Sequence, residues 1–264
     1  MGLVAAAATA LMLAVTPVQF IQAHGQNGAF AETGGPADAA LTSWAVLGLR
    51  AVGRPVPGSL AYLQSQEGSL LSTTDIALVA LAEQALGAQP ETLRARLRSA
   101  ARPSGVIGET VNSTCWAVLA LGQASRATTR YLLAQQAKGG GWSWLAGGQP
   151  DSNDTAAALE ALRVAGVRGA PVTRGAKFLL SFENRDGGFE LTHGRGSDAQ
   201  STAWAIQGLV AAGRKPPRSA FAYLAKLKRA DGSYRYSTRY VTTPVWVTSQ
   251  VLVALAKKPF PFAG

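Results

Sequence analysis

A segment of nine residues recurs six times along this chain, at intervals of about forty residues. Each copy is apolar at most positions and has threonine at its second position. The threonines are Thr42, Thr74, Thr114, Thr155, Thr202 and Thr248, with successive spacings of 32, 40, 41, 47 and 46 residues. A repeat of this length accommodates a helix, a turn, a second helix and a return loop. The chain is therefore predicted to fold as a series of helix pairs.

The recurring segments are predicted to be inner helices. They are apolar on nearly every face, as in "STCWAVLAL" (Ser113–Leu121), which is typical of a helix surrounded by protein. Amphipathic segments such as "PVTRGAKFLLSFEN" (Pro171–Asn184) lie between them and are predicted to be outer helices, since a leading proline suits a helix start. A glycine turn that ends in an aromatic residue, such as "GGGW" (Gly139–Trp142), follows most outer helices.

The last recurring segment favours a closed ring over an open solenoid. The terminal pairs of a solenoid normally carry polar caps, whereas "VTSQVLVALAKK" (Val247–Lys258) stays apolar almost to its end. We therefore expect an all-α fold, an α6/α6 toroid of six helix-pair repeats that forms one domain over residues 16–264. The first outer helix should include "TPVQFIQAHG" (Thr16–Gly25).

The first fifteen residues, Met1–Val15, form an almost uncharged run rich in Ala and Leu. The run is too short to span a membrane and has the length of the apolar region of a secretory signal. Because the usual basic flank is missing, it fits either a signal segment (residues 1–15) or part of the first helix. We expect a secreted or cell-surface protein, with a cytoplasmic location as the alternative.

The net charge of +10 is concentrated toward the C-terminus. From Ala199 to Gly264 there are ten Lys and Arg but a single acid, Asp231. One interpretation is a solvated surface that aids solubility; the other is a basic C-terminal face, including Lys226, Lys228 and Arg229, that attracts an anionic membrane, wall polymer or phosphorylated ligand. No nucleic acid is expected as a partner, since no base-reading module is recognisable.

Two motifs resemble those of a known superfamily. "QAKGGGW" (Gln136–Trp142) matches the Q-x-x-x-G-x-W motif of squalene-hopene cyclases, with degenerate copies at "ENRDGGF" and "KRADGSY". The chain thus resembles the terpenoid cyclase and protein prenyltransferase superfamily over essentially its whole length, which implies an α/α toroid. Class II terpene cyclases carry D-x-D-D-T-A, whose middle aspartate protonates an alkene or epoxide. Here the matching stretch is "DSNDTA" (Asp151–Ala156).

The departure from that motif falls on the decisive residue, because Asn153 stands where the family has its acid. An amide cannot donate the required proton. If the chain is an enzyme, Asp154 assisted by Asp151 is the candidate acid, but a shift of one residue turns a helical side chain by about 100°. The triterpene cyclases also use two barrels with the active site between them, whereas this chain has residues for one. Both points favour binding over catalysis.

The acid four residues before the threonine recurs in three repeats, at Asp38, Asp151 and Asp198. An aspartate at that place is predicted to be an N-cap, which accepts backbone N–H bonds at the start of an inner helix. The threonines are predicted to be structural as well, since their hydroxyls can bond a preceding turn.

Residues on either side of the threonine are the candidate ligand contacts. Amides two residues before it form either a polar ring around a ligand or an ordinary solvated end. Tryptophans two residues after it either fill the core or line a cavity that stabilises cations through their π faces. Trp246 adds a ring at the level of the amides. The candidates are Asn112, Asn153, Gln200, Trp44, Trp116, Trp204 and Trp246.

No metal or cofactor is expected, because the chain has only His24, His193 and Cys115 as soft ligands, and these are far apart in the sequence. Besides a structural interaction protein that uses the basic C-terminal face, two functions stay open. The first is an exported, non-catalytic toroid that binds an apolar or isoprenoid molecule, or a corrinoid-like ligand by analogy with helical barrels of the transcobalamin type. The second is a class II terpene cyclase-like enzyme that uses the altered motif.

Overall fold

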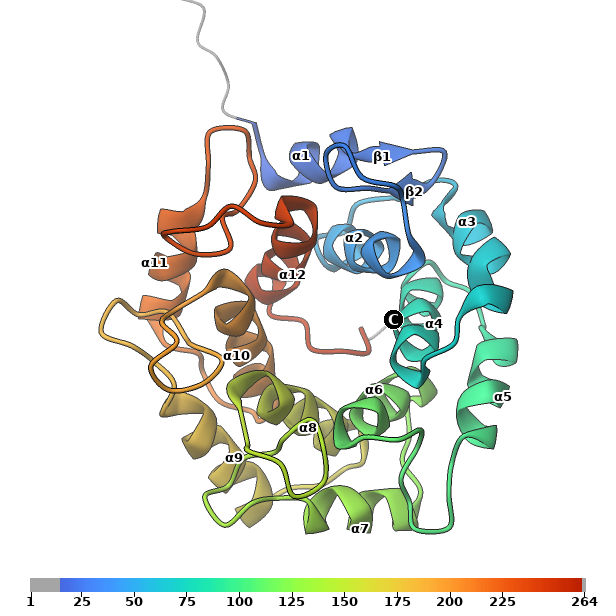
Figure 1. Ribbon diagram of the computed structural model, residues 1–264, viewed down its shortest axis with the longest axis vertical. Coiled ribbons are helices and arrows are strands. Elements are labelled where there is room, and N and C mark those ends of the chain that lie inside the picture. Colours follow the sequence, from blue (N-terminus) through green and yellow to red (C-terminus); the bar gives the residue numbers. More distant parts are fainter. Residues whose placement is uncertain (1–14, 263–264) are drawn as a thin grey trace, which may run out of the picture.

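Alternating helices form a closed ring of two layers (Figure 1). The computed structural model describes residues 15–262, so almost all of the Met1–Val15 segment lies outside the described part. The inner helices are α2 (Ala39–Ala51), α4 (Thr73–Ala85), α6 (Val111–Leu121), α8 (Ser152–Val164), α10 (Ala199–Ala211) and α12 (Pro244–Ala256). The outer helices are α1 (Pro17–Ala23), α3 (Ser59–Gln66), α5 (Glu91–Ser99), α7 (Arg126–Ala134), α9 (Ala170–Leu180) and α11 (Arg218–Leu227). A hairpin of β1 (Gly25–Gln26) and β2 (Ala29–Phe30) follows α1, and a 3-10 turn, η1 (Glu67–Ser69), follows α3. The predicted toroid is confirmed.

The ring closes where α12 packs against α2. The start of α12 has no side-chain cap of its own. Instead, Glu32 from the first repeat accepts hydrogen bonds from the backbone N–H groups of Val245 and Trp246, at 3.0 and 2.9 Å. A carboxylate at a helix N-terminus also complements the helix dipole. The first repeat thus supplies the cap that the last inner helix lacks.

In five repeats the threonine hydroxyl ties the inner helix to the turn before it. Each hydroxyl accepts a hydrogen bond, 2.9–3.0 Å long, from the backbone N–H of the apolar or aromatic residue that ends the glycine turn. The pairs are Phe30 with Thr42, Ile107 with Thr114, Trp142 with Thr155, Phe189 with Thr202 and Tyr234 with Thr248. The predicted structural role of the threonines is therefore confirmed in these repeats.

The predicted aspartate caps are confirmed too. Asp38, Asp151 and Asp198 each accept a bond of 2.7–2.8 Å from the backbone N–H three residues on. They therefore fix the starts of α2, α8 and α10.

After α12 the chain turns into the ring, where Figure 1 shows the last segment lying inside the inner helices. Phe260 is fully buried there. Its N–H donates to Oε2 of Glu160 at 2.6 Å, and its carbonyl accepts a hydrogen bond from Arg163. The ring of Phe260 lies 6.0 Å from that of Trp44 and 6.2 Å from that of Trp116. The C-terminal segment therefore plugs one end of the barrel.

The six inner helices run in the same direction, so their N-terminal ends share one face of the ring, the mouth face, and their C-terminal ends share the other, the far face. The basic C-terminal segment passes through both. Lys228 and Arg229 precede α12 and belong to the mouth face, whereas Lys257 and Lys258 follow it and belong to the far face. The basic residues of the C-terminal segment are therefore divided between the two faces. Within residues 15–262, no helix combines the length and apolarity needed to cross a membrane.

Candidate functional site

A pocket of about 360 Å³ opens at the mouth face, inside the ring of helix N-termini. Its lining comes from all six inner helices and from the loops before α8 and α10. The structure brings all nine candidate residues from the sequence together here: Trp44, Asn112, Trp116, Asp151, Asn153, Asp154, Gln200, Trp204 and Trp246.

Four tryptophans form the apolar part of this pocket. Trp44 lies at their centre, with ring centroids 5.8 Å from Trp116, 5.8 Å from Trp204 and 5.9 Å from Trp246. Trp116 and Trp204 are 5.5 Å apart, and the rings of Trp44, Trp116 and Trp204 meet edge to face, the geometry that aromatic quadrupoles favour. The indoles thus fill the core of the barrel and also line a cavity, because their outer surfaces form part of the pocket.

The amides lie at the rim of the pocket and carry unused hydrogen-bonding capacity. Asn112 is buried and donates to Oδ1 of Asp154 at 2.7 Å, but its own Oδ1 has no partner among the described residues. Gln250 from α12 is 1% exposed and lines the pocket, and its Oε1 is likewise unpartnered within the described chain. Buried polar atoms are nearly always hydrogen-bonded. Both oxygens are shielded from solvent, so they can pair with a donor on a ligand once their side chains turn toward the pocket.

Sequence reasoning did not single out Gln250. Its signal was nevertheless present, because it stands two residues after Thr248, the place that tryptophan takes in three other repeats.

Asp154 lines the same pocket as Asn153, so the turn of one residue does not remove it from the site. Burial raises the pKa of Asp154 to about 8, the nearby Asp151 carboxylate adds to the rise, and the hydrogen bond from Asn112 opposes it. The carboxyl is therefore mostly protonated at neutral pH and can donate a hydrogen bond, either to the adjacent Asp151 carboxylate or to a bound molecule.

Glu160, beneath the tryptophans, is a second buried acid, and its pKa is raised to about 8 by burial against the opposing hydrogen bond from Phe260. An acid with a raised folded pKa binds more protons in the folded than in the unfolded protein, so stability falls as pH rises from about 4.5 to about 8. Glu160→Gln lacks this titration. We therefore expect its free energy of unfolding to rise relative to that of the wild type as pH increases across that window, by roughly 1.4 kcal/mol per pH unit at most. Urea unfolding at pH 5 and pH 8 tests this, and parallel profiles for the two proteins would contradict it.

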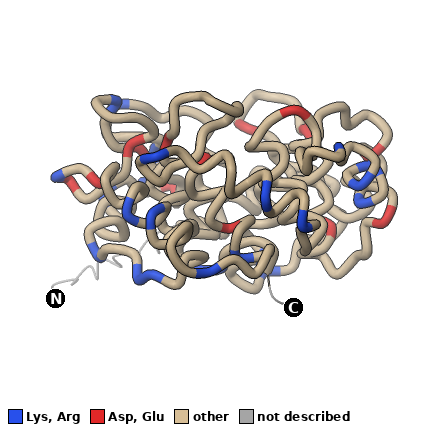
Figure 2. Tube along the Cα trace, turned by 90° about the horizontal axis from the view of Figure 1, so that it is seen from below, with Lys and Arg blue, Asp and Glu red and all other residues tan. Residues whose placement is uncertain are grey.

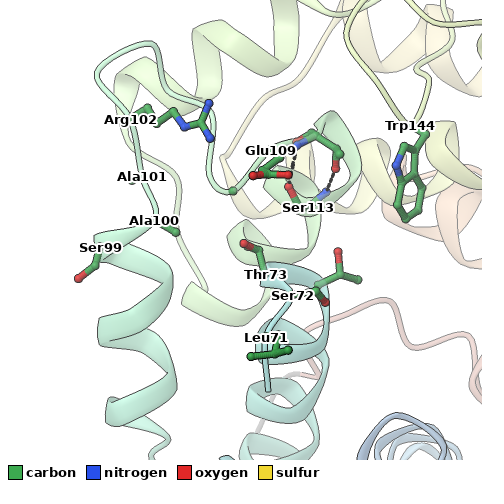
Figure 3. Close-up of a pocket in the computed structure, with 13 residues that line it drawn as sticks. Leu71, Ser72, Thr73, Ser99, Ala100, Ala101, Arg102, Glu109, Ser113 and Trp144 are labelled. Atoms are coloured by element: carbon green, nitrogen blue, oxygen red, sulfur yellow. Dashed lines mark hydrogen bonds between the residues drawn. The ribbon is translucent and has the colours of Figure 1, made fainter. Parts of the chain in front are cut away.

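A second pocket of about 580 Å³ lies next to the site, between the starts of α4 and α6 and the end of α5 (Figure 3). Thr74 and Trp144 line both pockets, so the mouth continues outward over the rim at this side. The polar groups of Thr110 and Ser113 are used in the capping box that starts α6. Trp144, which is 52% exposed and was not singled out from the sequence, stands at the edge of this opening.

Within residues 15–262 no three His, Cys, Asp or Glu residues are grouped as metal ligands would be. The polar side chains that line the pocket carry amides, carboxyl groups and the hydroxyl of Thr74.

No protein-family model and no curated protein sequence matches this chain. Solved structures do match it. A type II terpene cyclase from Scytonema, in complex with geranylgeranyl dihydroxybenzoate, is 15% identical with a TM-score of 0.71, over 91% of this chain and 94% of the cyclase. Protein geranylgeranyltransferase-I from Candida albicans, complexed with GGPP, is 11% identical with a TM-score of 0.64, over 82% and 83%. The fold is that of the terpenoid cyclases and protein prenyltransferases. A protein from Actinoplanes matches as well, with 17% identity and a TM-score of 0.72 over 91% and 97%.

The match to the Scytonema cyclase bears on the expectation that one barrel is too few for cyclase chemistry. From the sequence, the single barrel favours binding, because the active site of triterpene cyclases lies between two barrels. This toroid nevertheless spans 94% of the Scytonema cyclase. Chain size is therefore no argument against cyclase chemistry, and the choice between binding and catalysis depends on the residues of the pocket.

Proposed function

We propose that this toroid binds a small amphipathic molecule with an isoprenoid-type apolar body at its mouth and does not transform it. The observation that carries the proposal is the pocket itself, in which four indoles form the apolar part and amides and a protonated carboxyl surround them. Its volume of about 360 Å³ lies at the lower end of the range of small-molecule sites, about 300–1,000 Å³.

The polar groups indicate what the head of the ligand must offer. Oδ1 of Asn112 and Oε1 of Gln250 are acceptors without a partner among the described residues, so each suits a donor. Asp154, protonated at neutral pH, supplies a donor in return. A hydroxyl or phenol can donate and accept at once, which makes an isoprenoid alcohol or phenol the best fit to this set.

Two features support binding rather than catalysis. Asn153, at the place of the cyclase acid, has no proton to give, and protonation of an alkene demands a strong acid, whereas a pKa of about 8 makes Asp154 a weak one. The interior below the pocket is also filled, by the tryptophans and by Phe260, which leaves little room for a substrate that must fold before it cyclises.

The second candidate function is a class II cyclase-like activity with Asp154 as the acid. One observation favours it: a protonated carboxyl and the indoles of Trp116 and Trp204 line the same pocket. Under this alternative, incubation with polyprenyl substrates yields cyclised products, and Asp154→Asn abolishes them. Absence of products together with retained binding supports the first candidate.

Gln250→Leu tests the binding proposal. The substitution removes a buried acceptor without a partner, so we expect the protein to become more stable, by about 1 kcal/mol, while affinity for farnesol falls roughly tenfold. Tryptophan fluorescence measures the affinity, because five indoles line the site, the four of the cluster and that of Trp144. Gln207→Leu is the matched control, since its Oε1 is also buried and unpartnered in the described chain but lies outside the pocket.

The control should therefore stabilise the protein without changing affinity. Equal affinity for farnesol in the wild type and Gln250→Leu would contradict the proposal that Gln250 accepts a hydrogen bond from the polar head of the ligand. Native mass spectrometry of the protein from its own host then identifies the molecule that is carried, and a corrinoid in place of an isoprenoid would overturn the ligand class.

Export of the protein is also part of the proposal. It rests on the apolar Met1–Val15 segment, and N-terminal sequencing of the protein purified from its host tests it.

A further inference from the structure

The far face carries cations and no acids in the connections that build it. These connections are residues 52–58, 86–90, 122–125, 165–169, 212–217 and 257–262, all within the described chain, and their charged residues are Arg54, Arg168, Arg214, Lys215, Lys257 and Lys258. The connections that build the mouth face, residues 24–38, 70–72, 100–110, 135–151, 181–198 and 228–243, hold nine acidic and eight basic residues. In Figure 2 the lower edge of the ring carries Lys and Arg, whereas Asp and Glu lie above it together with further Lys and Arg.

Helix ends account for only part of this asymmetry. The C-terminal end of a helix favours cations, and Arg50 and Arg163 fill that role, since they donate to the carbonyls of Ala85 and Phe260. Lys257 lies over the ring of Phe221, 5.0 Å from its centroid. The other cations of the connections are exposed, and within residues 15–262 their side chains have no hydrogen bond or ion pair: Arg54, Arg168, Arg214, Lys215 and Lys258.

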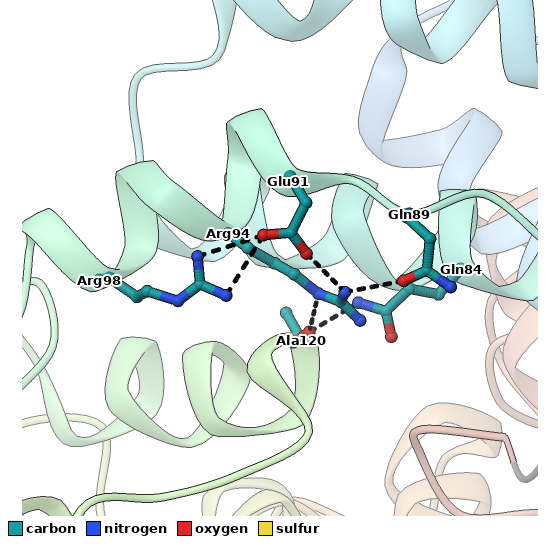
Figure 4. Close-up of polar contacts among 6 residues, drawn as sticks. All are labelled: Gln84, Gln89, Glu91, Arg94, Arg98 and Ala120. Atoms are coloured by element: carbon teal, nitrogen blue, oxygen red, sulfur yellow. Dashed lines mark hydrogen bonds and ion pairs between the residues drawn. The ribbon is translucent and has the colours of Figure 1, made fainter.

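An exposed acid at the start of α5 is already neutralised by its own helix. Glu91 accepts from Arg94 at 2.9 Å and pairs with Arg98 at 3.3 Å, and these two guanidinium groups hold its pKa below its usual range (Figure 4). It therefore does not offset the positive charge of the far face.

We propose that the far face docks on an anionic lipid bilayer, as a peripheral contact. Six cations on one side of the molecule match the clusters of four to eight basic residues that bind acidic lipids. They come from four of the six connections, so they are spread over a face rather than aligned along a groove. Leu255 is partly exposed next to Lys257 and Lys258, whereas Phe260 is buried and Phe262 is half-buried, so the described far-face connections hold no fully exposed ring for stacking on a nucleic-acid base. A lipid surface is thus the polyanion that best matches cations spread over a whole face beside a partly exposed leucine.

This orientation has a consequence for the ligand. The pocket opens on the mouth face, on the opposite side of the ring from the docking surface. A molecule bound to a bilayer through its far face therefore presents its ligand site to the aqueous side, and ligand exchange occurs with water or a soluble partner.

Co-sedimentation with vesicles tests the docking surface. The wild type should bind vesicles of phosphatidylcholine mixed with phosphatidylglycerol, lose that binding as salt is raised, and not bind pure phosphatidylcholine. The triple variant Arg168→Glu, Arg214→Glu, Lys215→Glu should lose roughly 100-fold in partitioning, since each basic residue near the surface contributes about fivefold. The matched control is Lys138→Glu, Arg185→Glu, Arg239→Glu, which changes net charge equally but on the mouth face.

The control variant should retain most of the binding. The proposal is overturned if the wild type does not bind anionic vesicles at low salt, if pure phosphatidylcholine binds it as well, or if the two triple variants lose binding equally. All the substituted side chains are exposed, and thermal unfolding of each variant verifies that it is folded.

Discussion

Phe260→Ala should lower the free energy of unfolding by about 3–5 kcal/mol, as deletion of a fully buried phenylalanine ring does elsewhere. The ring is 0% exposed and lies against Trp44 and Trp116, so its loss leaves a cavity directly beneath the indoles of the pocket. The backbone bonds to Glu160 and Arg163 do not involve the side chain and should persist. Urea unfolding followed by tryptophan fluorescence measures the loss.

Phe262→Ala is the matched control. Its ring touches that of Phe260, with centroids 5.2 Å apart, but it is only partly buried, so the expected loss is about 1 kcal/mol. Similar small losses in both variants would show that the plug is not part of the core. If the plug does set the depth of the pocket, Phe260→Ala should also accept longer isoprenoid alcohols than the wild type does.

The repeat made much of the fold and the site predictable from sequence. A threonine every forty residues indicates where each inner helix begins, and in three of the six the acid four residues earlier supplies the cap. Residues two places before and two places after the threonine then fall on the side of the helix that faces the axis. For that reason Asn112, Trp116 and Trp204, chosen from spacing alone, lie in one pocket.

Long-range contacts made the rest unpredictable. Glu32 caps a helix that begins more than two hundred residues later, and nothing near Glu32 in the sequence indicates it. The hydrogen bond between Asn112 and Asp154 joins two inner helices, and the burial that raises the pKa of Asp154 likewise depends on the closed ring. The segment "KPFPF" (Lys258–Phe262) has prolines that end a helix, and only the closed ring reveals a space in which Phe260 is buried.

Gly48→Ala should destabilise the protein by roughly 3 kcal/mol, although helix propensity alone predicts a gain of about 1 kcal/mol. Gly48 lies in α2, at the seam where the ring closes. A Cβ on this residue would stand 2.7 Å from the carbonyl oxygen and 2.9 Å from the Cα of Ser249 in α12. Because these are backbone atoms, no side chain can move aside, and the two helices must separate.

The control is Gly68→Ala, in the 3-10 turn η1, where a Cβ meets no atom within 4 Å. It should leave stability unchanged or raise it by about 0.5 kcal/mol, because alanine restricts the unfolded chain more than glycine does. Stabilisation by Gly48→Ala, to the same extent as the control, would mean that α2 and α12 do not pack this closely and that the ring is open at this seam. A loss confined to Gly48→Ala would instead locate the closure of the toroid at the contact between the first and last repeats, where Glu32 also joins them.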